Sequence, residues 1–212
     1  MIRRSLAVAL VLLTGGCTAD APDYQAIWST NSSSAPPTTT AEPVPFSQYL
    51  ENSGVGATQV APDKLTGLTV SMPTPPGWAR RTGANIPPAT EVISKDSPYP
   101  NAMLTVFTLS GDFDPAEVVK HSNVDAAQSQ NFAQLDASAA DFHGFPSSMI
   151  QYSYDFDGKR LHTFRRTVIA TGSPPQRQRY LVQFVVTSLA DQAVPESAGI
   201  ESIINGFTVA AG

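Results

Sequence analysis

Histidines and paired acids are the side chains to test first for catalysis, because imidazole titrates near neutral pH and carboxylates can transfer protons. His121, His143 and His162 stand apart, and none is spaced with another histidine, cysteine or acid as in a metal-binding motif. Asp155 and Asp157 are two residues apart, but they flank a predicted turn, where aspartate is favoured for conformational reasons. The chain also lacks a Gly-x-Ser-x-Gly nucleophile elbow and a glycine-rich phosphate loop. We therefore predict no catalytic residues, no cofactor and no metal.

Cys17, the only cysteine, could undergo a different chemistry, covalent lipid attachment. Arg3 and Arg4 precede an uninterrupted apolar run over residues 6–13, and small residues then lead into the cysteine. That run is too short to span a bilayer but has the length of a signal-peptide core. The arrangement resembles a bacterial lipobox, in which the cysteine thiol receives a diacylglyceryl group and the new amino terminus can be acylated.

This resemblance predicts a signal peptide over residues 1–16 and lipid attachment at Cys17. The alternative is an ordinary secretory signal with an incidental cysteine. Most lipoboxes carry Leu, Val or Ile three residues before the cysteine, and this chain has Thr14 there.

Charge and cysteine content limit the function classes. The chain has 212 residues and a net charge of −5; without residues 1–16 it would carry 11 basic and 18 acidic residues, a net charge of −7. This acidic balance argues against nucleic-acid binding. With its one cysteine used for lipid, the domain has no disulfide and depends on its core alone.

A segment rich in serine, threonine and proline separates Cys17 from the first predicted helix. Residues 29–45 include eight Ser or Thr and four Pro among 17 residues. Such a composition buries little apolar surface against its ordering entropy. We predict that residues 17–45 are a disordered tether and that residues 46–212 fold.

The folded segment shows an α+β pattern. Helices are predicted over residues 46–54, 115–128 and 195–205, the second beginning with the capping sequence Asp114-Pro115-Ala116-Glu117. Strands are predicted over residues 68–72, 90–94, 103–109, 132–142, 148–156, 160–170 and 179–189, with Asp157-Gly158 as a hairpin turn. We expect one antiparallel sheet flanked by helices.

Basic residues concentrate on the last two of these strands. No acid occurs between Gly158 and Ala190, a stretch that holds six of the 11 basic residues. One interpretation is a solvated strand face; the other is contact with an anionic headgroup or an acidic partner. Neighbours in a strand point to opposite faces, so Arg165 and Arg166 cannot share one flat patch. The candidate contact residues are Arg165, Arg166, Arg177, Arg179 and His162.

Aromatic residues form a second candidate surface. Tyr152, Tyr154 and Phe156 alternate on one strand, and Phe164 and Trp78 are candidates to join them. Such a row is most often plain core, and the alternative is the lining of a cleft for an acyl chain or a sugar.

Several segments resemble the mycobacterial LpqN/LpqT lipoprotein family, in particular its LpqT branch. They begin at Phe46 (FSQYLE), Leu68 (LTVSMPTPPGW), Pro100 (PNAML), Phe142 (FHGFPSSMI), Gly158 (GKRLHT) and Arg179 (RYLVQ). The resemblance implies an α/β/α sandwich of the PsbP/Mog type and an accessory role near envelope lipid export or glycolipid handling. It brings no catalytic residues with it.

Together these observations predict a non-enzymatic binding module, anchored by lipid to the extracytoplasmic face of the cell membrane. The expected partner is an envelope glycolipid or a lipid-export membrane protein, and no nucleic acid. The alternatives are a hydrolase acting on envelope glycolipids and a purely structural envelope lipoprotein. The oligomeric state stays open.

Overall fold

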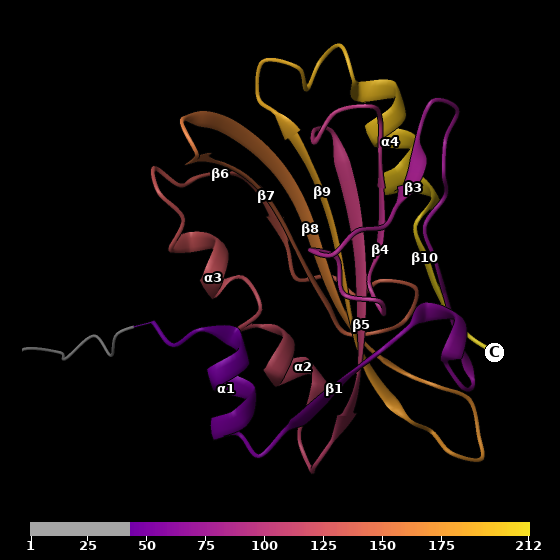
Figure 1. Cartoon of the computed structure of the whole chain (residues 1–212). Coiled ribbons are helices and arrows are strands. Elements are labelled where there is room, and N and C mark those ends of the chain that lie inside the picture. The colour runs from indigo at the N-terminus through magenta and orange to yellow at the C-terminus, as the bar shows by residue number, and fades with distance from the viewer. Residues whose placement is uncertain (1–42) are drawn as a thin grey trace, which may run out of the picture. The chain divides into compact units, whose positions relative to one another are not determined.

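The computed structural model describes residues 43–212 (Figure 1). The predicted signal peptide, Cys17 and all but the last three residues of the predicted tether lie outside the described residues. The helices are α1 (Phe46–Asn52), α2 (Pro115–Val119), α3 (Val124–Ala127) and α4 (Ser197–Gly206), with a 3₁₀ turn, η1, over Pro62–Lys64. The strands are β1 (Gly56–Val60), β2 (Leu68–Ser71), β3 (Ala79–Arg81), β4 (Glu91–Ser94), β5 (Asn101–Ser110), β6 (Ala133–Ser138), β7 (Ser147–Phe156), β8 (Lys159–Thr171), β9 (Arg179–Leu189) and β10 (Thr208–Ala211).

Eight of these strands form one antiparallel sheet: seven follow the order β3-β4-β5-β9-β8-β7-β6, and β1 pairs with β5 beside this row. The edge of β5 is shared: β4 pairs with its first half and β1 with its second half. β9 lies at the centre, and its apolar side chains are buried on both faces of the sheet. β2 and β10 form a separate two-stranded sheet.

Both faces of the large sheet are covered. On the face that we call the helix side, α1 and α2 pack on Leu109, Ile169 and Leu181, and α3 packs on β7. On the opposite face lies the main core, closed by α4 and the small β2–β10 sheet. Figure 1 shows α1, α2 and α3 together on one side of the sheet and α4 with β10 on the other. The predicted α+β class is confirmed.

Two local signals act as the sequence predicts. The Asp114 carboxylate accepts a 2.9 Å hydrogen bond from the Ala116 N–H, and Pro115 takes the first helical position. Asp157 and Gly158 have φ of 50° and 69° and join β7 to β8 in a two-residue hairpin turn.

The predicted helix over residues 115–128 is wrong in its length, because the chain breaks between α2 and α3. The buried Ser122 hydroxyl donates to the carbonyl oxygen of Val119 at 2.8 Å. The Asn123 amide nitrogen donates to the Ser148 hydroxyl on β7 at 2.7 Å. Such side-chain bonds compete with helical backbone bonds, and here they end one helix and place the next against the sheet.

Three strands escape the sequence analysis: β1, β3 and β10. β3 and β10 have three and four residues, too few for a convincing alternation. β10 pairs with β2 across more than a hundred residues, a contact that no local pattern indicates.

Candidate functional site

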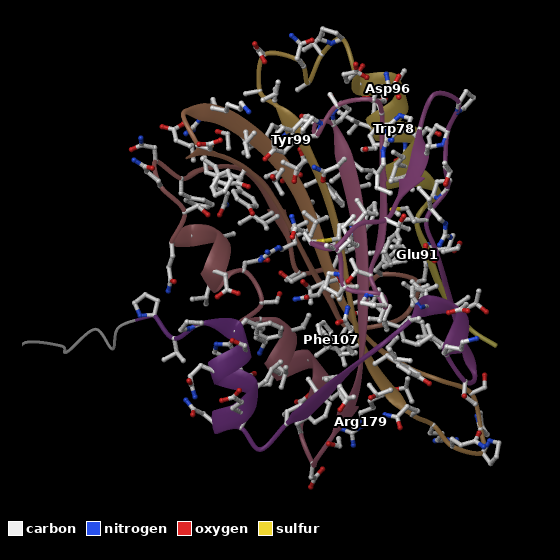
Figure 2. All side chains as sticks on the ribbon, viewed as in Figure 1. Trp78, Glu91, Asp96, Tyr99, Phe107 and Arg179 are labelled. Carbon is white, nitrogen blue, oxygen red and sulfur yellow. The ribbon has the colours of Figure 1, made fainter. Side chains whose placement is uncertain are left out.

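The candidate arginines do not gather into one surface. Arg165 and Arg166 are consecutive on β8, and Arg165 faces the helix side while Arg166 packs on the opposite face. Arg177 is exposed in the loop before β9, where its φ is 48°. Arg179 begins β9 at the far end of the sheet from the β7–β8 turn (Figure 2). Each arginine therefore lies in surroundings of its own.

Arg166 packs on aromatic rings. Its guanidinium carbon lies 4.4 Å from the centre of the Phe142 ring and 5.7 Å from that of Phe164. Its Nη1 donates to the Ser147 hydroxyl at 3.4 Å. Burial lowers the pKa of Arg166, since a charge is less stable away from water. These contacts make Arg166 a part of the packing on this face.

Two other basic side chains are held by local partners. The Arg179 guanidinium lies 4.4 Å from the centre of the Phe113 ring and donates to the Phe113 carbonyl oxygen at 2.8 Å. Arg160 donates to the Asp155 carboxylate at 3.0 Å. Hydrogen bonds from Asn131 and Arg160 lower the pKa of Asp155. Asp155 thus serves the β7–β8 hairpin and is not half of an acid pair.

The histidines lie in three unrelated surroundings. His121 follows α2, and its Nε2 lies 3.8 Å from the Glu117 carboxylate in a partly exposed pair. The His143 Nδ1 lies 3.2 Å from the carbonyl oxygen of Val209. The His162 Nε2 is buried without a hydrogen-bond partner, and burial lowers the pKa of this imidazole. No two of them share a site.

The predicted aromatic row is divided between the two faces of the sheet. Tyr152 and Tyr154 stack on the helix side with ring centres 5.3 Å apart. Phe164 and Trp78 belong to the main core on the opposite face. Phe156, at the end of β7, is 59% exposed.

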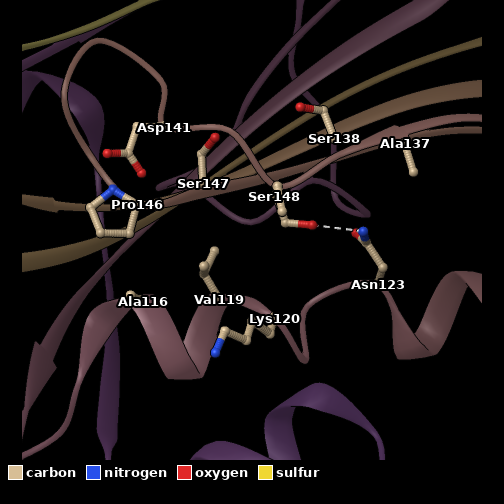
Figure 3. A pocket seen from close by; sticks show the side chains of 11 residues that line it. Ala116, Val119, Lys120, Asn123, Ala137, Ser138, Asp141, Pro146, Ser147 and Ser148 are labelled. Atoms are coloured by element: carbon tan, nitrogen blue, oxygen red, sulfur yellow. Dashed lines mark hydrogen bonds between the residues drawn. The ribbon is translucent and has the colours of Figure 1, made fainter.

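The helix side contains a pocket of about 400 Å³ between α2, β6 and the start of β7, which we call the α2–β7 pocket (Figure 3). Its apolar wall is made of small side chains from Ala116, Val119, Ala137, Ala139 and Pro146. Its polar lining comes from Lys120, Asn123, Ser138, Asp141, Ser147 and Ser148. The pocket therefore combines hydrogen-bond donors and acceptors with a wall of small apolar side chains, and its one cation, Lys120, is paired with Glu117 at 2.6 Å.

Asn123 is the polar group whose bonding is incomplete in this pocket. Its amide nitrogen donates to Ser148, as Figure 3 shows, while its Oδ1 is buried with no hydrogen-bond partner. Buried polar atoms nearly always have a partner, so an orphan acceptor in a pocket wall suits a ligand that donates to it.

A second cavity of about 280 Å³ lies between α1, α3 and the sheet, and we call it the Arg165 pocket. Its apolar lining consists of Phe46, Leu50, Ala57, Phe107 and Leu181. Ser47, Asp125, Gln183 and Arg165 supply its polar groups, and the Arg165 Nε is buried without a hydrogen-bond partner.

A row of polar side chains crosses the sheet between the two pockets. Gln183 of β9, Thr167 of β8 and Ser148 of β7 are successive cross-strand partners. The Thr167 hydroxyl is also buried without a partner. Three of the five such atoms among residues 43–212 therefore lie on the helix side: those of Asn123, Arg165 and Thr167.

Sequence reasoning found Arg165 but missed the α2–β7 pocket. Ser147 and Ser148 look like ordinary strand residues, and Asn123 falls inside a predicted helix. The available signal was the Ser122-Asn123 pair in mid-helix, since these residue types favour helix ends and turns. Among residues 43–212, no group of three or more His, Cys, Asp or Glu is placed to hold a metal ion. Within the same range, no helix is long and apolar enough to cross a membrane.

Comparison with known proteins gives consistent matches. A family model described as "Probable lipoprotein LpqN" matches residues 42–210. A putative lipoprotein LpqT of Mycobacterium tuberculosis is 55% identical over 98% of this chain and 95% of that protein. The crystal structure of LpqN, involved in cell envelope biogenesis of M. tuberculosis, matches with a TM-score of 0.66 at 20% identity, over 80% of this chain and 99% of that chain. Cyanobacterial PsbP from Synechocystis matches with a TM-score of 0.43 at 15% identity, over 69% of this chain and 94% of that chain.

Proposed function

Because this chain belongs to the LpqN lipoprotein family, we propose that it is a lipid-anchored binding module of the cell envelope that holds a glycolipid headgroup in the α2–β7 pocket. In this proposal the module is extracytoplasmic and non-enzymatic. Cys17 carries the lipid, and residues 17–45 serve as the tether between anchor and domain.

The α2–β7 pocket is the observation that carries the proposal. Its volume of about 400 Å³ lies within the usual range of ligand pockets, about 300–1,000 Å³. A sugar offers many hydroxyls at fixed angles, and Asn123, Asp141 and Ser138 can accept from them or donate to them. The small apolar wall leaves room for the C–H face of a sugar ring.

The anchor supplies location and effective concentration. A domain tethered to the membrane meets membrane lipids at a far higher local concentration than a free one. One acyl chain holds a protein only weakly, whereas the two chains of a diacylglyceryl group anchor it firmly. This supports a role in which the domain takes up or presents an envelope lipid.

Membrane-extracted protein tests the ligand directly. Native mass spectrometry should show a co-purified lipid, and hydrolysis of that lipid should release a sugar. In a defined assay, octyl glucoside should bind and octanol should not. Protein that carries no lipid, and that binds octyl glucoside no better than octanol, would overturn the proposed ligand. Capture of a membrane transporter by such lipid-free protein would instead favour a protein partner.

The anchor has its own test. Mass spectrometry of the amino-terminal peptide should show a diacylglyceryl group on Cys17. A Cys17→Ala chain should leave the membrane fraction. An unmodified Cys17, or a Cys17→Ala chain that stays on membranes, would contradict the lipid anchor. Neither result would bear on ligand binding in the α2–β7 pocket.

A further inference from the structure

We infer that the Arg165 pocket is a second ligand site, which binds a carboxylate or a phosphate carried at the head of an acyl chain. It is separate from the α2–β7 pocket, and it takes a ligand class that the glycolipid proposal does not require.

Arg165 carries a charge that no acid pairs with among the described residues. Arg165 is half-buried on β8, and its cross-strand partners Ile150 and Val185 are apolar. Its Nε is buried without a hydrogen-bond partner, and it takes part in none of the ion pairs formed among residues 43–212. A half-buried guanidinium whose Nε–H lacks an acceptor is costly, and an entering anion would relieve that cost.

The one acid in the lining of this pocket is already engaged. The Asp125 Oδ1 accepts a 3.0 Å hydrogen bond from the backbone N–H of Phe46, the first residue of α1. Asp125 forms no ion pair with Arg165, and its bond to Phe46 links α3 to α1 beside the pocket. The guanidinium fork stays available for the two oxygens of a carboxylate or a phosphate, and the Gln183 amide lines the same space.

The rest of the pocket suits an alkyl chain. Phe46, Leu50, Phe107 and Leu181 line a volume of about 280 Å³, just below the usual range for ligand pockets, about 300–1,000 Å³. This accommodates a headgroup and the first part of a chain.

An apolar strip continues from the pocket along the helix side. Val185 lies between Arg165 and Met103 in the same cross-strand row. Met103 is 38% exposed, so the helices leave this part of the sheet partly open. A chain leaving the pocket would lie on Val185 and Met103 with its acid group on Arg165.

The test compares three twelve-carbon probes: dodecanoate, dodecyl phosphate and neutral dodecanol. Calorimetric titration would use residues 17–212 with Cys17→Ala, which keep the whole compact unit. The wild-type pocket should bind at least one of the two anions about tenfold or more tightly than dodecanol. The tighter anion identifies a carboxylate or a phosphate as the recognised group.

Variants then locate the binding. Arg165→Gln should reduce affinity for the preferred anion by about tenfold or more and leave dodecanol within about twofold. Arg177→Gln, which removes an exposed arginine outside the pocket, should leave all three affinities unchanged. Arg165→Lys keeps the positive charge but loses the two-pronged geometry of the guanidinium. Its affinity for the preferred anion should lie between those of the wild type and Arg165→Gln.

Two results would overturn the inference: equal binding of all three probes by the wild-type chain, or unchanged anion binding by a folded Arg165→Gln chain. The wild-type comparison needs no variant, so the inference stays testable if Arg165→Gln fails to fold. Neither result bears on octyl glucoside binding in the α2–β7 pocket.

Discussion

The guanidinium of Arg166 lies over the ring of Phe142, with its central carbon 4.4 Å from the ring centre. Phe142 stacks in turn on Phe207 of the main core, with ring centres 5.4 Å apart. Arg166 therefore covers one end of an aromatic stack, and its charge reaches solvent only in part.

From this arrangement we expect Arg166→Ala to affect stability and not anion binding. Loss of the cation–π contact and of the packed aliphatic stem should lower the free energy of unfolding by about 2 kcal/mol. Urea unfolding measures this change, with Arg177→Ala as an exposed control expected within about 0.5 kcal/mol. Weaker dodecanoate binding by a folded Arg166→Ala chain would show that this arginine contacts ligand after all.

Alanine substitutions at two glycines with positive φ would separate the free-energy cost of backbone strain from that of a steric clash. Gly158 in the β7–β8 turn has open space around it, and Gly158→Ala should cost about 1 kcal/mol for the left-handed conformation alone. A Cβ on Gly111, where φ is 106°, would lie 2.4 Å from the carbonyl oxygen of Gly54. Gly111→Ala should therefore cost about 3 kcal/mol or more. Equal unfolding midpoints in urea for the two variants would contradict the close approach of the Gly54 loop to Gly111.

Local signals predicted much of the fold. Asp114-Pro115 and Asp157-Gly158 determine backbone geometry by themselves, so the helix start and the hairpin follow from the residues. The β2–β10 pairing could not be predicted, because its stability comes from the tertiary packing of four-residue strands. The same holds for the break after Val119, since the partner of Asn123 is Ser148 on a distant strand.

The candidate site was less predictable than the fold. Arg165 stood out as one of six basic residues in an acid-free stretch, but its pocket depends on α1 and α3 lying beside it. The α2–β7 pocket is lined mostly by alanine and serine, which carry no functional signal in a sequence. The pocket is space that the side chains leave empty in the folded chain. Hydrophobic periodicity indicates only which positions are buried.

The ionised Asp155 should stabilise the fold at neutral pH and lose that effect in acid. Hydrogen bonds from Asn131 and Arg160 hold its folded-state pKa below the unfolded value of about 3.9. Its contribution is therefore complete above the unfolded pKa and is lost as pH falls through the folded pKa.

The check is the difference in Tm between the wild-type chain and Asp155→Asn. We expect the wild type to be more stable at pH 5 and above, and the difference to shrink steadily below pH 4. Asp157→Asn in the adjacent turn is the matched control, and a pH-independent difference at Asp155 would mean that its pairing contributes nothing.

Substitution of Asn123 can separate a structural role from a binding role. In the ligand-free protein its amide nitrogen should stabilise the fold and its unpartnered oxygen should destabilise it. Removing the 2.7 Å bond to Ser148 should cost about 1 kcal/mol, while removing the buried, unpartnered Oδ1 should return a similar amount. Asn123→Ala should therefore change the free energy of unfolding by less than about 0.5 kcal/mol and weaken octyl glucoside binding by about tenfold or more. The control is Asn101→Ala, which removes a 2.8 Å bond to the Pro98 carbonyl oxygen on the exposed surface and should leave binding unchanged. Lower stability with unchanged octyl glucoside binding would instead show that Asn123 acts in the fold alone, through its hydrogen bond to Ser148.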